Sequence, residues 1–173
     1  MSVHLEKAFE DEICQHLGSN GWIYEHPVAQ DYDREKAIYT LDLIAWVEEA
    51  WPDTWESLKS NFGSRAQDQL LSAVRRELDR KGTLKVIREG AAVLGIGTLK
   101  LAAFKPAHDL NEEILKRYQA NRLRVARQIK YSLHNENSID LVLFLNGIPV
   151  ATVELKTDNT QSVKAAVGQY MKD

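Results

Sequence analysis

The chain has 173 residues, of which 44% are hydrophobic and 27% charged, and its formal net charge is −3 at pH 7. This size and composition predict one soluble globular domain with a core of its own. No apolar run is long enough to span a membrane, and the acidic, amphipathic N-terminus is not a signal peptide. Cys14 is the only cysteine, which excludes an intrachain disulfide, so we expect a cytoplasmic protein. The net negative charge argues mildly against nucleic-acid binding by bulk electrostatics.

The N-terminal half of the chain is predicted to be helical. Residues 3–18 place apolar side chains at every fourth position, which is typical of a helix with one face on a core: Leu5, Phe9, Ile13 and Leu17. A short extended piece over 22–24 follows. Three further helices are expected over 41–50, 53–61 and 66–80. We interpret residues 41–80 as a helical insertion whose tryptophans pack in a core rather than stack on bases.

Strands dominate the C-terminal half. The expected elements are a strand over 97–105, a helix over 111–120, a strand over 122–132, two strands within 138–156 and a helix over 160–171; residues 83–89 fit either state. This order indicates an α+β or α/β fold with a mixed sheet. We expect a single domain, residues 1–173, whose core is 83–173 plus the first helix. The chain stops inside the last expected helix, so we expect a piece of a longer polypeptide.

Residues 138–156, SIDLVLFLNGIPVATVELK, carry the chemistry. Asp140 lies near the start of one strand, while Glu154 and Lys156 lie at the end of the next and share a face because they are two residues apart. Two carboxylates on adjacent strands can bind Mg²⁺. The metal would lower the pKa of a bound water, and Lys156 would orient the attacking water or stabilise the transition state. This layout is typical of a metal-dependent phosphodiesterase.

The register of these strands decides whether the carboxylates meet. A simple two-residue turn at Asn146-Gly147 would place Asp140 opposite Val153, with Glu154 on the other face. An odd-length loop or a one-residue bulge restores the common face. We predict a three-residue loop, at 146–148 or at 145–147. The alternative is an ordinary hairpin in which Glu154 and Lys156 are solvated.

A basic segment precedes this hairpin. Residues 116–130 contain six cationic side chains and no Asp or Glu: Lys116, Arg117, Arg122, Arg124, Arg127 and Lys130. Such patches commonly contact phosphates. We predict DNA contacts from the members on the expected strand, which are Arg122, Arg124, Arg127 and Lys130. Alternatively, some of these residues form a solvated face or neutralise nearby carboxylates.

The segments NRLRVARQIKYS, SIDLVLFLNGIPVATVELK and AAVGQYMKD resemble the N-terminal nuclease domain of the R (restriction, or motor) subunit of type I restriction–modification enzymes. The resemblance implies a PD-(D/E)xK nuclease fold, a mixed central sheet flanked by helices. It implies Mg²⁺, or Mn²⁺ in its place, on Asp140 and Glu154, with Lys156 as the catalytic lysine. It also implies that Gln169 and Tyr170 act near the site or on DNA. A Glu from the first helix often completes such sites, and Glu10 matches better than Glu6.

The resemblance implies double-stranded DNA and the methylation and specificity subunits as partners, with cutting away from the recognition site. One departure is Ile139, which stands where the pattern has Pro before the Asp. The chain also lacks a G-x-x-x-x-G-K-[ST] phosphate loop, so ATP would serve only translocase modules outside it. Two alternatives stay open: a non-catalytic docking domain that uses residues 41–80, and a nuclease of another role such as DNA repair.

Overall fold

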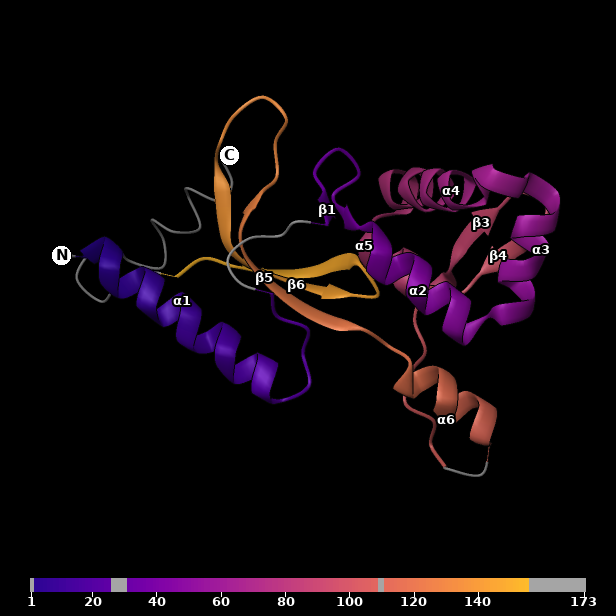
Figure 1. Cartoon of the computed structure of the whole chain (residues 1–173), viewed down its shortest axis with the longest axis horizontal. Coiled ribbons are helices and arrows are strands. Elements are labelled where there is room, and N and C mark those ends of the chain that lie inside the picture. The colour runs from indigo at the N-terminus through magenta and orange to yellow at the C-terminus, as the bar shows by residue number, and fades with distance from the viewer. Residues whose placement is uncertain (1, 26–30, 109–110, 156–173) are drawn as a thin grey trace.

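The structure is a computed structural model that describes residues 2–25, 31–108 and 111–155. Figure 1 shows a small sheet beside the long N-terminal helix, and a helical lobe at the other end of the molecule. The N-terminal helix is α1 (Ser2–Ser19). The sheet has the order β5-β6-β7 and consists of β5 (Leu123–Lys130), β6 (Ser138–Leu145) and β7 (Ile148–Val153). The chain is therefore a mixed α/β protein.

The helical lobe occupies the region expected as an insertion. It contains α2 (Thr40–Ala50), α3 (Pro52–Phe62), a single 3₁₀ turn, η1 (Gly63–Arg65), α4 (Ala66–Lys81) and α5 (Thr83–Glu89). Pro52 opens α3, where its missing N–H would have had no helical partner. Trp46 and Trp55 are buried in the lobe's core, as predicted. The ambiguous segment 83–89 is a helix.

Two short hairpins were not predicted from the sequence. β1 (Tyr32–Asp33) pairs with β2 (Ile38–Tyr39), and β3 (Ala91–Val93) pairs with β4 (Gly97–Leu99). The strand expected over 97–105 therefore ends at Leu99. Strands this short carry too few residues for an alternating pattern to stand out.

The expected mixed sheet is antiparallel among the described strands. β5 pairs with β6 and β6 pairs with β7 in antiparallel fashion, and the described parallel contact is an isolated bridge between Ile23 and Arg124. Helix α6 (Glu112–Gln119) begins where expected, because the Asn111 side chain accepts a hydrogen bond from the Ile114 N–H at 3.1 Å. The helix expected over 160–171 lies outside the described residues.

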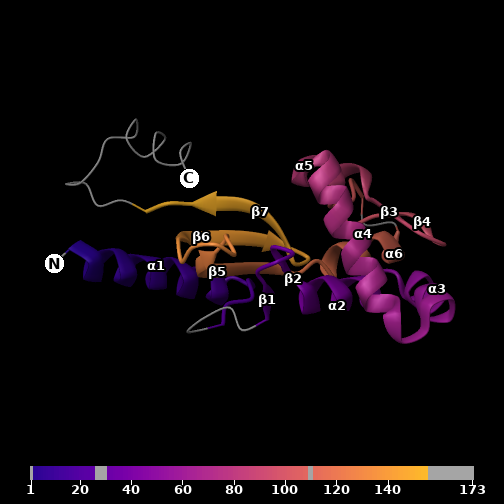
Figure 2. The ribbon, with the colours of Figure 1, turned by 90° about the horizontal axis from the view of Figure 1, so that it is seen from above.

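The sheet lies between α1 and the lobe. On one face Val125 of β5 and Leu141 of β6 pack with Cys14 of α1. On the other face Phe144 packs with Tyr39, at the junction of β2 and α2. Figure 2 shows α1 running alongside β5 and the lobe beyond the far end of the sheet. At one end of the sheet, side chains from α1, β5 and β6 can therefore meet.

The β6–β7 hairpin combines a tight turn with a bulge. Leu145 pairs with Ile148, and Asn146 and Gly147 have φ values of 51° and 79°, so the turn has two residues and the predicted three-residue loop is wrong. The register shifts by one residue between Leu143 and Phe144. Beyond this bulge Leu141 pairs with Val153. If this pairing is continued by one residue, Glu154 lies opposite Asp140. The two side chains then share one face of the sheet, as expected for a one-residue bulge.

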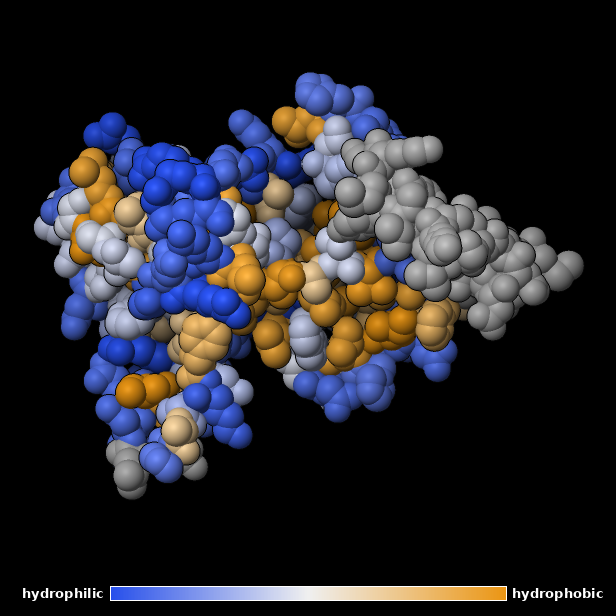
Figure 3. Space-filling model, turned by 180° about the vertical axis from the view of Figure 1, so that it is seen from behind, coloured by the Kyte–Doolittle hydropathy of each residue, from blue (hydrophilic) through white to orange (hydrophobic). Residues whose placement is uncertain are grey.

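An apolar surface extends across the back of the sheet. Figure 3 shows hydrophobic side chains, in orange, gathered across the middle of this side of the molecule. Val150 of β7, for example, is 44% exposed. Within the described part of the chain, no helix combines the length and apolarity needed to cross a bilayer.

Candidate active site

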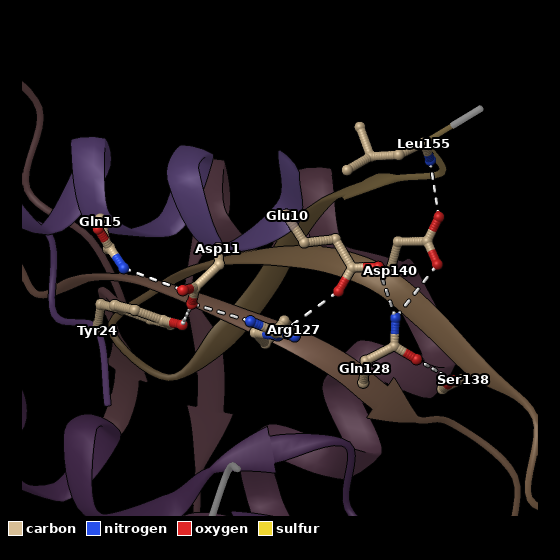
Figure 4. A network of polar contacts seen from close by, with 9 residues as sticks. All are labelled: Glu10, Asp11, Gln15, Tyr24, Arg127, Gln128, Ser138, Asp140 and Leu155. Carbon is tan, nitrogen blue, oxygen red and sulfur yellow. Dashed lines mark hydrogen bonds and ion pairs between the residues drawn. The ribbon is translucent and has the colours of Figure 1, made fainter. Parts of the chain in front are cut away.

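Two carboxylates from opposite ends of the chain meet at one glutamine. Glu10 of α1 is 2% exposed, and its Oε1 accepts a hydrogen bond from Gln128 Nε2 of β5 at 3.0 Å. The same Nε2 donates to Asp140 Oδ1 of β6 at 3.4 Å. The other oxygen of Asp140 accepts the Leu155 N–H at 2.7 Å. Figure 4 shows both carboxylates directed toward the glutamine amide. We call Glu10 and Asp140 the acidic pair.

An unusual backbone conformation brings Gln128 to this position. Its φ is 53°, in the left-handed region that residues other than glycine rarely adopt. The strand's alternation is interrupted here, because Ala126 and Ile129 pack in the same apolar cluster although they are three residues apart. Between them, Arg127 and Gln128 both reach Glu10. Regular alternation would have turned one of these two side chains away from α1.

Arg127 neutralises part of the negative charge on α1. Its Nε lies 3.5 Å from Glu10 Oε2, and its Nη1 donates to Asp11 Oδ1 at 2.9 Å. The Tyr24 hydroxyl also donates to Asp11 at 2.8 Å. Burial and this hydrogen bond raise the pKa of Tyr24 to about 12, so the phenol stays a donor at neutral pH. Glu10 Oε2 is buried and accepts no hydrogen bond from the described residues.

The acidic pair has the chemistry of a site for a hard cation. Carboxylate oxygens are the ligands that Mg²⁺ and Mn²⁺ prefer, and a buried carboxylate oxygen without a hydrogen bond is a ready ligand. Glu154 follows β7 directly and is exposed. The described residues contain no group of three or more His, Cys, Asp or Glu side chains arranged to hold one metal ion. The register of β6 and β7, continued by one residue past Leu141 and Val153, places Asp140 and Glu154 opposite each other, and Glu10 joins Asp140 through Gln128.

Three predicted site residues, Lys156, Gln169 and Tyr170, lie outside the described residues.

The surroundings of Arg124 do not fit the DNA contact that was predicted for it. Its side chain is buried, with Nε 2.6 Å from Asp42 Oδ2 and Nη2 3.1 Å from Asp42 Oδ1. Its Nη1 lies 3.2 Å from Glu25, and its guanidinium stacks over the Tyr39 ring at 4.4 Å. These contacts tie β5 to α2, so Arg124 serves the fold and is not available to a phosphate backbone. The alternative, that basic residues neutralise carboxylates, applies to it.

The remaining members of the predicted DNA surface differ in exposure. Arg127 is largely buried against α1, so it also belongs to the carboxylate network. The Nε of Arg122 is buried and has no hydrogen-bond partner among the described residues. Lys130 remains half-exposed on the surface, where it forms an ion pair with Glu136. Of the four, Lys130 is placed most openly for a phosphate.

The comparisons with known proteins give one result. The family model described as "Type I restriction enzyme R protein N terminus" matches residues 4–173. The chain belongs to this family. Neither the curated proteins nor the solved structures include a match. The resemblance noted in the sequence is thus confirmed at the level of the family.

Within this R-protein N terminus, sequence reasoning missed Gln128 and Ser138. The Ser138 hydroxyl donates to Gln128 Oε1 at 2.8 Å and so completes the polar network around the acidic pair. Both residues were visible only as polar positions on predicted strands. No signal in the pattern identifies a glutamine that leaves the strand's alternation.

Proposed function

We propose that this domain is the Mg²⁺-dependent endonuclease of a type I restriction system and that its sheet and α1 form a PD-(D/E)xK core. The observation that carries this proposal is the convergence of Glu10 and Asp140 on one amide, in a site where Glu10 is buried and keeps a carboxylate oxygen without a hydrogen bond. Burial of a carboxylate such as Glu10 costs free energy unless a cation or donors compensate. Membership of the R-protein family supports the same reading.

Each residue has a proposed role. Asp140 and Glu154 would hold the cation, and Glu10 from the first helix would complete the site; the cation, when bound, supplies charge neutralisation and an activated water at a phosphodiester. Lys156 would stabilise negative charge that develops on the phosphate, and Gln169 and Tyr170 would act near the site or on the DNA. The Leu155 N–H fixes one oxygen of Asp140, which leaves the other directed toward the Gln128 amide that also bonds Glu10. Arg127 holds Glu10 and Asp11 in position.

The proposed partners follow from the family. Double-stranded DNA is the substrate, a separate specificity subunit with its methylation partner reads the target, and ATP serves translocase modules outside this chain. Lys130 is the described residue of the basic segment that we propose to contact the DNA backbone.

The alternative of a non-catalytic docking domain lacks the exposed aromatic surface that it was expected to have. It called for exposed tryptophans in residues 41–80, whereas Trp46 and Trp55 are buried. Trp51 is partly buried, and the guanidinium of Arg117 covers its ring at 4.0 Å. The aromatic side chains of the lobe are therefore engaged within the domain.

The test is DNA cleavage by the assembled restriction complex with Mg²⁺ and ATP. We expect Asp140→Asn and Lys156→Ala to abolish cleavage while translocation continues. Glu48→Gln, an exposed acidic residue on α2, is the control and should cut like the wild type. Circular dichroism of each variant checks that the fold is intact. Wild-type cleavage by either site variant would disprove the assignment.

A further inference from the structure

We propose that Gln128 is a placeholder for the cation: its amide nitrogen bonds both members of the acidic pair and would withdraw when a divalent ion binds. The inference rests on the proposed function, because it names how that same site behaves without its metal. It assigns a role to a residue that neither the sequence pattern nor the family resemblance identified.

The first argument is electrostatic. Glu10 and Asp140 are like charges that both lie within hydrogen-bond distance of Gln128 Nε2, at 3.0 and 3.4 Å. An amide nitrogen has two N–H donors, so one side chain can satisfy one oxygen of each carboxylate. The amide therefore performs, with two partial positive charges, what a cation would perform with a full charge.

The second argument concerns orientation. The Ser138 hydroxyl donates to Gln128 Oε1 at 2.8 Å. This contact holds the amide oxygen on the side away from the acidic pair and the nitrogen toward it, as Figure 4 shows. A nitrogen that donates both hydrogens has no lone pair to offer a metal. Gln128 in this pose is consequently a competitor of the cation and not one of its ligands.

The third argument concerns the carboxylate oxygens. Mg²⁺ binds carboxylate oxygens at about 2.0–2.1 Å. A cation held by Glu10 and Asp140 would need carboxylate oxygens that Nε2 bonds here, so ion and amide would compete for them. The left-handed backbone at Gln128, with φ 53°, is a conformation that persists only where its surroundings hold it. Residues so constrained gather at functional sites more often than elsewhere.

The experiment measures Mn²⁺ affinity on the full chain by electron paramagnetic resonance and calorimetry. We expect Gln128→Ala to bind Mn²⁺ about tenfold more tightly than the wild type, which corresponds to the loss of competing amide contacts worth about 1.4 kcal/mol together. In EDTA the same variant should unfold at a lower urea concentration than the wild type, because the acidic pair loses its hydrogen-bond donors. Gln128→Gly repeats the test with a residue that accepts a positive φ at no steric cost. Gln119→Ala, on exposed α6, is the matched control.

The outcomes separate the two proposals. If Asp140→Asn abolishes Mn²⁺ binding while both Gln128 variants bind equally or more weakly, the placeholder is refuted and the metal site stands. If the wild type binds no Mn²⁺, or binding survives Asp140→Asn, the metal site is wrong and the placeholder falls with it. Tighter binding together with lower metal-free stability supports the placeholder, since a purely structural glutamine would not strengthen metal binding when removed.

Discussion

Removing the charge of Asp42 should destabilise the whole domain. Asp42 and Arg124 are 4% and 6% exposed, and two hydrogen bonds of 2.6 and 3.1 Å join them between α2 and β5. Breaking a buried pair by removing one partner typically costs about 3–5 kcal/mol, because the other charge stays buried. Glu25 remains 3.2 Å from Arg124 and is half-exposed, so we place Asp42→Asn at the lower end, about 3 kcal/mol.

The loss should be visible in urea. With a slope of about 2 kcal/mol per molar, the unfolding midpoint should fall by about 1.5 M. The buried Trp46 and Trp55 supply the fluorescence signal. Such a loss is a large share of the roughly 5–15 kcal/mol by which domains are stable.

A double-mutant cycle completes this test. Asp42→Leu combined with Arg124→Met replaces the pair with apolar side chains, and we expect it to be more stable than either single variant. Arg124→Met alone should lower stability and leave the salt dependence of DNA binding unchanged. An Asp42→Asn loss under about 1 kcal/mol, or a changed salt slope in Arg124→Met, would refute the structural role of Arg124.

Two further changes probe the turn and α4. Gly147→Ala would place a Cβ 2.2 Å from the Tyr39 carbonyl oxygen at a φ of 79°. We therefore expect the free energy of unfolding in urea to fall by about 3 kcal/mol or more. A loss below about 1 kcal/mol would contradict the close packing of the turn against Tyr39. Hydrogen bonds from Arg80 and Lys81 lower the pKa of Glu77 to about 2 from 4.5. The resulting stability should be complete above pH 4.5 and lost as the pH falls toward 2, so Glu77→Gln should show a smaller loss than the wild type between midpoints measured at pH 7 and pH 3.

Local signals in the sequence were sufficient for most elements. Helical periodicity predicted α1 and helices α2 to α4 of the lobe, and the Asn111 cap was placed correctly. The hairpin was placed at Asn146-Gly147, although its loop is one residue shorter than predicted. These features depend on neighbours a few residues apart. The fold class of mixed α and β structure followed from their order.

Features set by distant contacts could not be predicted. The charge pattern could not distinguish a buried Arg124 from an exposed one, because its partner Asp42 is 82 residues away. The bulge in β7 and the left-handed Gln128 each move a side chain to another face, and neither has a sequence signature. The catalytic roles of Lys156, Gln169 and Tyr170 stay predictions, since these residues lie outside the described part.

The pairing of α1 with the sheet also has a consequence for biosynthesis. Glu10 and Gln128 are 118 residues apart in sequence, and the entire helical lobe is encoded between them. At a synthesis rate of about 5–20 residues per second, Gln128 follows Glu10 by roughly 6–24 seconds. The lobe, built from helices adjacent in sequence, can fold in that interval, because local contacts form quickly. A nascent chain would therefore bring Glu10 and Gln128 together only after the whole lobe between them has been synthesised.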